Sequence, residues 1–323
     1  MSELSHGITR RLFTLGAATR LSLRNGWING EYGTRPAKVR LLNNTVRLSG
    51  AISLGTRATA FQLPEGMRPN RPTYVAIDLC NGAVGRLLIL PTGKVKVQSA
   101  TDFSAASCFA SLEGATFRLS APNPLATLNN WTSAAFGTRA SKAAVSGPTI
   151  HLVGGVTGGD TSLVTVLPEG LRPNATVYVR TNLCGAAPGR LIIESNGEVR
   201  AASPTDFTDA QCFTSLDGAS FTLGPASPVT LANSWTTTQY STRAPKVSVS
   251  NGTVRFRGAV QDGSRGRLFV LPVNMRPRAD VYVAVDLCAG VPGRLYIRPN
   301  GVVKVISSVE FSDAQCFTSL EGV

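Results

Sequence analysis

Histidine is nearly absent from this chain of 323 residues: only His6 and His151 occur, and there are 6 lysines against 26 arginines. Two histidines leave little material for a metal centre or a Ser-His-Asp triad. Only 16% of residues are charged, yet no apolar run approaches the roughly 18 residues that a transmembrane helix needs. We therefore expect no metal, no cofactor and no membrane span.

What the chain does contain is a repeat. Trp27, Trp131 and Trp235 stand 104 residues apart, and three cysteine pairs recur at the same interval. The repeat predicts three modules of ordinary domain size, which we call module 1 (residues 25–128), module 2 (129–232) and module 3 (233–323), after a segment at residues 1–24.

Alternation of apolar and polar residues predicts strands throughout each module. Residues 246–260 form two alternating runs around Asn251-Gly252, a pair that accepts positive φ in a tight hairpin. Further short runs follow at 268–271, 281–287, 294–298 and 302–306, separated by proline and glycine turns. We expect an all-β fold: three antiparallel, jelly-roll-like β-sandwich modules in a pseudo-three-fold arrangement.

The six cysteines predict one disulfide per module, because each pair is separated by 28 residues. Buried free thiols are the main alternative, and metal binding is disfavoured because no histidine recurs with the pairs. Disulfides would imply an oxidising location, which is extracellular, on a cell surface or on a virion surface. The pairs are Cys80 with Cys108, Cys184 with Cys212, and Cys288 with Cys316.

The third copy stops short of an apolar segment that the others contain. Phe117-Arg118-Leu119 and Phe221-Thr222-Leu223 have no counterpart after Val323, whereas Phe13-Thr14-Leu15 matches them 104 residues before the first. We expect residues 1–24 to complete module 3 through Phe13 and Leu15. Strand donation to a neighbouring molecule, simple edge contact, and a twin-arginine export signal around Arg10-Arg11 are the alternatives.

The net charge of +13 does not follow the repeat, since residues 25–128 carry +6 and residues 129–232 carry −1. A polyanion site shared by all modules would need basic charge in every copy. We therefore expect no nucleic-acid partner.

Three sets of recurring residues are candidates for function. An aromatic face packs well on a sugar, and a guanidinium can hold a hydroxyl or an acid group. The recurring acids would suit acid-base chemistry if they met in one cleft, but turn capping or pairing with arginine is the favoured interpretation. The sets are Trp27, Trp131 and Trp235; Arg35, Arg139 and Arg243; and the acids Asp102, Asp206 and Glu310 with Glu113, Asp217 and Glu321.

A second kind of candidate is the loop that differs between copies, at residues 54–58, 158–162 and 262–267. Variable loops on a repeated scaffold commonly carry binding specificity.

The phrase Leu-Pro-Glu-Gly-Met-Arg-Pro at residues 63–69, with its copies at 167–173 and 271–277, resembles the C-terminal β-modules of phage tail-fibre and related receptor-binding proteins. Such modules are typically trimeric, so the resemblance implies that three linked copies imitate a trimer within one chain. The ending Cys-Phe-x-Ser-Leu-Glu/Asp-Gly, as at residues 212–218, departs from that pattern.

Together these features predict a monomeric, non-enzymatic binding protein that recognises a glycan or cell-surface receptor through loops or module junctions. The alternative is a structural fibre, tip or shell protein whose protein partner is bound by strand exchange.

Overall fold

The computed structural model describes residues 17–237 and 240–323. Phe13 and Leu15, the predicted closing residues, lie outside this part of the chain. The described residues form short β-strands joined by turns, 3₁₀ helices and six-residue α-helices. Module 1 contains β1 (Thr19–Arg20), β2 (Ile28–Asn29), β3 (Lys38–Leu42), β4 (Thr45–Ser49), β5 (Ala51–Ser53), β6 (Thr59–Gln62), β7 (Thr73–Asp78), β8 (Val84–Ile89), β9 (Lys94–Ser99), α1 (Phe103–Cys108), β10 (Ala110–Ser111) and β11 (Thr116–Arg118).

The same succession recurs twice. Module 2 contains β12 (Asn123–Pro124), β13 (Thr132–Ser133), β14 (Lys142–Ser146), β15 (Thr149–Val153), β16 (Gly155–Thr157), β17 (Leu163–Val166), β18 (Val177–Asn182), β19 (Pro188–Ile193), β20 (Glu198–Ala202), α2 (Phe207–Cys212), β21 (Thr214–Ser215) and β22 (Ser220–Thr222). Module 3 contains β23 (Ser227–Pro228), β24 (Thr236–Thr237), β25 (Lys246–Ser250), β26 (Thr253–Arg257), β27 (Ala259–Gln261), β28 (Arg267–Val270), β29 (Val281–Asp286), β30 (Pro292–Ile297), β31 (Val302–Ser307), α3 (Phe311–Cys316) and β32 (Thr318–Ser319).

Single 3₁₀ turns fill the connections at recurring positions. They are η1 (Glu31–Gly33), η2 (Glu65–Met67), η3 (Cys80–Gly82), η4 (Ala135–Gly137), η5 (Glu169–Leu171), η6 (Cys184–Ala186), η7 (Val273–Met275) and η8 (Cys288–Gly290).

Each module is built from antiparallel sheets, which confirms the predicted all-β fold. In module 1 the strand orders are β1-β3-β4-β11, β10-β5-β2 and β6-β9-β8-β7. Module 2 has the same orders. In module 3 the first sheet has only β23-β25-β26 among the described residues, because no strand there takes the place of β11.

The predicted hairpin in module 3 is confirmed. Ser250 pairs with Thr253, and the two turn residues Asn251 and Gly252 have φ of 52° and 69°. Both central residues are thus left-handed, as the turn that matches strand twist requires.

The short α-helices were not predicted. Residues 103–108, which end at the second cysteine of module 1, form α1, and α2 and α3 stand at the matching positions. Asp102 caps α1 through a bond from the Ser104 backbone N–H at 2.8 Å, and Asp206 caps α2 in the same way. A single turn after a capping acid is too short to show a helical period in the sequence.

Each module buries its own core. The largest fully buried side chains include Phe61 and Phe117 in module 1, Phe221 in module 2 and Phe269 in module 3. The predicted disulfides are confirmed: all six cysteines are paired within their modules, with Cα–Cα distances of 5.6 to 5.7 Å. Closing a loop of this length contributes about 3 to 4 kcal/mol on the chain-entropy estimate.

The predicted boundary before residue 25 is wrong for the described part of the first segment. Thr19 in β1 pairs with Val39 in β3, and Leu21 is buried in the core of module 1. The same arrangement holds for β12 in module 2 and β23 in module 3. Each module therefore begins with the short strand that the sequence had placed before it.

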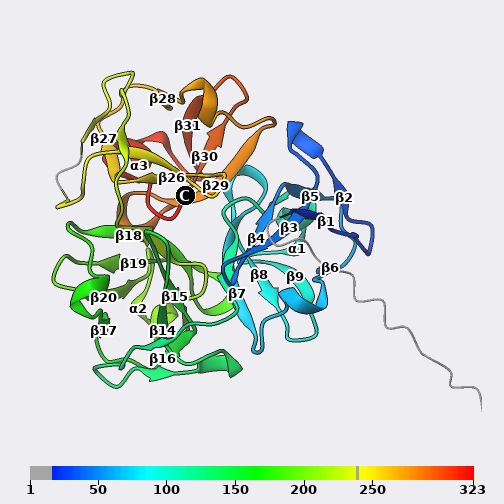
Figure 1. Cartoon of the computed structure of the whole chain (residues 1–323), viewed down its shortest axis with the longest axis vertical. Coiled ribbons are helices and arrows are strands. Elements are labelled where there is room, and N and C mark those ends of the chain that lie inside the picture. Colours follow the sequence, from blue (N-terminus) through cyan, green and yellow to red (C-terminus); the bar gives the residue numbers. More distant parts are fainter. Residues whose placement is uncertain (1–16, 238–239) are drawn as a thin grey trace, which may run out of the picture.

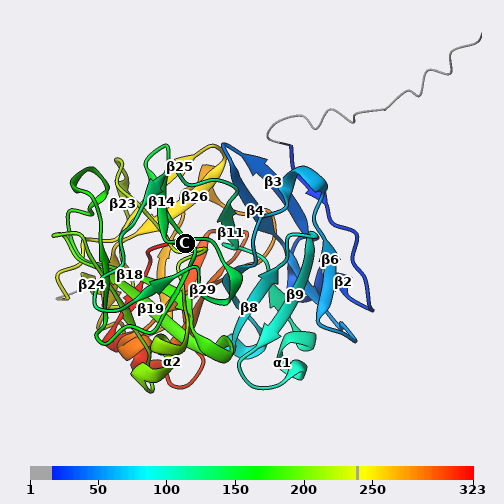
Figure 2. The same cartoon turned by 90° about the horizontal axis from the view of Figure 1, so that it is seen from below.

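The three modules lie around a common centre, with β7, β18 and β29 facing one another there (Figure 1). Seen from below, β3, β14 and the β25–β26 hairpin lie toward one end, and α1 and α2 lie toward the other (Figure 2). No helix in the described ranges is long and apolar enough to cross a membrane.

Candidate functional site

The three tryptophans are core residues, so the predicted sugar platforms at Trp27, Trp131 and Trp235 are wrong. Their exposed fractions are only 3 to 4%. Each indole N–H donates to a backbone carbonyl of the variable loop, as Trp131 does to Thr161 at 2.8 Å. A glycine of that loop covers the ring: a Cβ on Gly159 would lie 2.0 Å from Trp131 Cε2. The tryptophans hold the variable loops in place and offer no face to a ligand.

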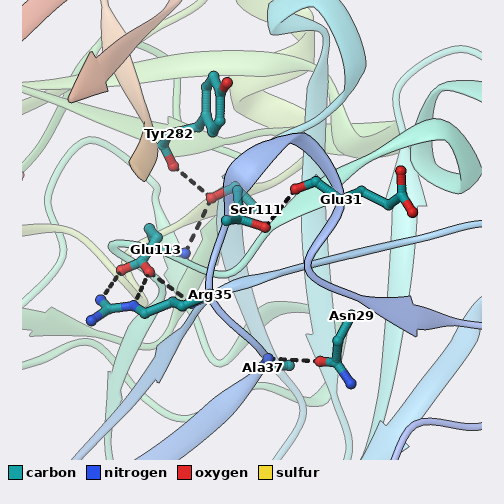
Figure 3. A network of polar contacts seen from close by, with 9 residues as sticks. Asn29, Glu31, Arg35, Ala37, Ser111, Glu113 and Tyr282 are labelled. Atoms are coloured by element: carbon teal, nitrogen blue, oxygen red, sulfur yellow. Dashed lines mark hydrogen bonds and ion pairs between the residues drawn. The ribbon is translucent and has the colours of Figure 1, made fainter. Parts of the chain in front are cut away.

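The recurring arginines form ion pairs with the recurring acids, as the favoured structural interpretation predicts. Arg35 donates from Nε and Nη2 to the two carboxylate oxygens of Glu113, both at 2.6 Å (Figure 3). Arg243 forms the same bidentate ion pair with Glu321. Such paired bonds fix both side chains.

In module 2 the shorter acid changes this pair. Arg139 Nη2 donates to Asp217 Oδ1 at 2.7 Å, but Asp217 Oδ2 has no hydrogen-bond partner among the described residues. Burial raises the pKa of Asp217 to about 6, in opposition to the charge of Arg139. A single hydrogen bond from arginine stabilises the ionised carboxylate of Asp217 less than the two hydrogen bonds that Glu113 and Glu321 each accept.

The two sets of acids do not share a cleft. Asp102 and Asp206 cap helices, whereas Glu113, Asp217 and Glu321 line a cavity of about 40 Å³ between the three modules. That volume accommodates a few waters. Glu113, Asp217 and Glu321 each form an ion pair with an arginine of their own module. The two sets of acids therefore do not form a general acid-base pair.

A cycle of arginines joins the modules. Arg86 Nη1 of module 1 donates to Asn182 Oδ1 of module 2 at 3.2 Å. Arg190 of module 2 reaches Asp286 of module 3 at 3.4 Å, and Arg294 of module 3 reaches Asp78 of module 1 at 3.3 Å. Each module therefore donates to one neighbour and accepts from the other.

A second cycle runs in the opposite sense. Ser111 Oγ of module 1 donates to the Tyr282 carbonyl of module 3 (Figure 3), Ser215 to that of Tyr74, and Ser319 to that of Tyr178. These equivalent hydroxyls satisfy strand carbonyls at the junctions that would otherwise be buried without a partner.

Each junction also carries a cluster of aromatic rings, which forms the candidate binding site. At the junction of modules 1 and 2, a small groove is lined by Tyr74, Arg86, Phe136, Cys184, Gly185 and Phe213. The rings of Tyr74 and Phe136 both pack edge to face on Phe213, with centroids 5.1 and 5.3 Å away. Arg86 lies over the Tyr74 ring at 4.7 Å.

The other two junctions have the same components. Tyr178, Arg190, Tyr240 and Phe317 meet between modules 2 and 3, and Tyr282, Arg294, Tyr32 and Phe109 meet between modules 3 and 1. We call the three clusters the junction grooves, after the groove between modules 1 and 2.

One aromatic in each junction groove faces solvent. Tyr32, Phe136 and Tyr240 are 55%, 60% and 47% exposed, unlike the tryptophans. Tyr32 and Phe136 also hold left-handed backbone, with φ of 56° and 52°. Bulky residues adopt that conformation only where the surrounding structure imposes it, and such positions cluster at functional sites.

These three aromatics were not predicted as candidates, although the sequence carries a signal for them. Tyr32, Phe136 and Tyr240 recur every 104 residues, as the tryptophans do. Their role depends on contacts between modules, which a repeat in sequence does not reveal.

The two carboxylates that accept from the arginine cycle, Asp78 and Asp286, are buried. Burial raises the pKa of Asp78 to about 7 against the opposing charges of Arg294 and Arg180, and the pKa of Asp286 also rises to about 7. Arg180 is itself buried, and its sister positions are Ala76 and Ala284. Module 2 thus supplies one central guanidinium that faces two carboxylates from its neighbours.

These raised pKa values predict that the protein gains stability as pH falls from 8 to 6.5. Asp78 and Asp286 take up protons at higher pH in the folded state than in the unfolded chain, so folding binds protons in this range. His151 acts oppositely: burial lowers its pKa to about 4, so its stabilising contribution is lost as pH falls from about 6.5 through 4. The measurement is the melting temperature at constant ionic strength.

The control for this pH dependence is the double variant Asp78→Asn/Asp286→Asn, which copies the natural Asn182. Its melting temperature should change much less between pH 8 and 6.5. A wild-type melting temperature that falls over that range would contradict the assignment.

Within residues 17–237 and 240–323, no group of three or more His, Cys, Asp and Glu side chains is placed to hold a metal ion.

Comparison with known proteins gives a likeness to a solved structure. No protein-family model and no curated protein matches the chain. A solved structure, the receptor binding protein gp15 of Listeria phage PSA, is similar at 14% sequence identity and a TM-score of 0.25. The match covers 30% of this chain and 61% of that chain. The described residues define an all-β chain with three internal disulfides and a recurring aromatic cluster at the junctions between its modules.

Proposed function

We propose that this protein is a non-enzymatic surface-binding protein that recognises carbohydrate in its junction grooves, on a pseudo-three-fold ring of three modules. The observation that carries the proposal is the exposed aromatic of each groove, Tyr32, Phe136 or Tyr240, beside an arginine stacked on a second ring. An open ring face packs on the apolar side of a sugar, and a guanidinium binds its hydroxyl or acid groups.

The groove between modules 1 and 2 is small, at about 40 Å³, so it fits one edge of a sugar ring. Weak single sites become effective when three act together on a surface that displays many copies of the ligand. The three disulfides support an oxidising location, extracellular or on a cell or virion surface.

The test is a glycan array probed with the wild-type protein and with the variant Tyr32→Ala/Phe136→Ala/Tyr240→Ala. We expect saturable wild-type binding to a related set of sugars, and a roughly tenfold or greater loss in the variant, equivalent to about 1.4 kcal/mol. The matched control is Val273→Ala, an exposed apolar residue outside the grooves.

Two results would contradict this proposal. One is no binding to any glycan by the wild type, and the other is unchanged binding in the triple variant with an intact fold.

A structural role by strand exchange is the second proposal, favoured by one observation: β26 has no partner strand on its outer side among the described residues. Free strand edges pair with other chains. Light scattering across a concentration series tests this role, since strand exchange between molecules would raise the mean mass with concentration.

A further inference from the structure

The outer edge of β26 in module 3 has no partner strand among the described residues, whereas the equivalent strands of modules 1 and 2 are paired on both sides. In module 1, β11 lies along β4, with Thr116 opposite Arg47, Phe117 opposite Val46 and Arg118 opposite Thr45. In module 2, β22 lies along β15 in the same register. Among the described residues, β26 pairs on one side only, with β25.

Two residues of β26 are less buried than their equivalents in β4 and β15. Thr45 and Val46 in β4 are 1% and 0% exposed, and Thr149 and Ile150 in β15 are both 1% exposed. Thr253 and Val254, the equivalent residues of β26, are only partly buried.

Among the described residues, the core of module 3 has no counterpart of an aromatic side chain that the other two cores share. Phe117 and Phe221 are 2% and 1% exposed and pack into the cores of modules 1 and 2 from β11 and β22, which have no counterpart in the described part of module 3. The buried cluster of module 3 contains no residue at that position among the described residues. An apolar aromatic is the side chain that would complete it.

The order in which the chain passes between modules indicates which segment would pair with the outer edge of β26. Between β11 and β12 the chain passes from the sheet of module 1 to the sheet of module 2. At the equivalent place β1 pairs with β3 of module 1, as β12 pairs with β14, in the same register. The segment before β1 thus corresponds to β11, one module earlier, which is module 3.

The β25–β26 hairpin of module 3 lies close to β3 and β4 of module 1. Arg40 in β3, next to the residue that pairs with Thr19, donates to the Asn251 carbonyl in the β25–β26 turn at 2.9 Å. Arg47 Nη1 donates to Thr253 Oγ1 at 2.7 Å. Figure 2 shows the β25–β26 hairpin beside β3 and β4. In the sequence, residues 15–19 stand 104 positions before residues 119–123, which make this step in the next copy.

We propose that residues 12–14 of the same molecule form the missing strand on β26, with Phe13 opposite Val254 and completing the core of module 3. Val323 already occupies the position equivalent to Ala115, where its carbonyl accepts from Phe256 N–H at 3.0 Å, as that of Ala115 accepts from Leu48. The proposed strand at residues 12–14 would thus continue the edge of the sheet from the position of Val323.

The register gives a cross-linking test in the full-length chain. The alternation of antiparallel pairing makes Thr14 and Thr253 a directly opposed pair without mutual backbone bonds, where side chains come closest. In module 1 the same two positions touch, since Arg118 Nη1 donates to Thr45 Oγ1 at 2.8 Å. The variant Thr14→Cys/Thr253→Cys should form a disulfide within one molecule, read by non-reducing peptide mass mapping at monomeric mass.

The matched control is Leu15→Cys/Thr253→Cys, which moves the thiol to the opposite face and should not cross-link. A second measurement is hydrogen exchange in Phe13→Asp, which should accelerate at the β26 amides and leave β4 unchanged. A dimer linked through the two introduced thiols would overturn closure in favour of strand donation. A folded protein with free thiols at both positions and unchanged β26 exchange would show that another segment fills the edge.

Discussion

Replacing Trp131 by alanine is expected to lower the free energy of unfolding by about 3 to 5 kcal/mol, because a buried aromatic leaves a cavity that the fold cannot close. Trp131 is 3% exposed and packs edge to face on Phe207 at 6.3 Å. Its indole N–H also holds the Thr161 carbonyl, so the loop at residues 158–162 would lose its anchor. Denaturant unfolding with a fixed slope measures the change.

The matched control for Trp131→Ala is Phe136→Ala. Phe136 is 60% exposed, so we expect its removal to cost less than about 1 kcal/mol while glycan binding falls. The reverse outcome, a stable Trp131→Ala protein that loses binding, would return the tryptophans to the ligand site.

Removing the Asp78 side chain is expected to destabilise the protein by about 3 kcal/mol at pH 8, because it leaves the buried guanidinium of Arg294 without its hydrogen-bond acceptor. Asp78 is 2% exposed and accepts from Arg294 Nη1, the ion pair that joins module 3 to module 1. The charge of Arg180 also acts on it. Chemical denaturation of Asp78→Ala gives the total cost, and hydrogen exchange in β7, β29 and β30 locates it.

The control is Asp78→Asn, which keeps an oxygen acceptor of the same size and copies Asn182 of module 2. We expect it to cost less than about 1 kcal/mol, since a hydrogen bond to Arg294 is retained. Equal losses in the alanine and asparagine variants would show that charge, and not hydrogen bonding, secures this junction.

Much of each module was predictable because strand signals are local. Alternation and the Asn251-Gly252 turn placed the β25–β26 hairpin, and the equal spacing of Cys80 and Cys108 with their copies indicated the disulfides. The recurrence of arginines and acids in every copy suggested that they pair, and the structure shows that Glu113, not Asp102, is the partner of Arg35.

The errors arose where residues serve distant partners. A tryptophan ring such as that of Trp27 could stack on a sugar, but Gly55 and the Arg57 carbonyl cover it. These two residues lie 28 and 30 positions further along the chain. Tyr32 looks ordinary in sequence and is the exposed member of a groove completed by Tyr282 of another module.

The sequence by itself determined the repeat, the β-strand content, the cysteine pairing pattern and the pairing of recurring acids with recurring arginines. These features depend on neighbouring residues or on equal spacing, which the chain displays directly. Only the tertiary structure decided which aromatics are buried, which acid faces which arginine across a junction, and that Arg180 serves two modules. Burial and inter-module contact bring together residues that are far apart in the chain, and no local pattern records that.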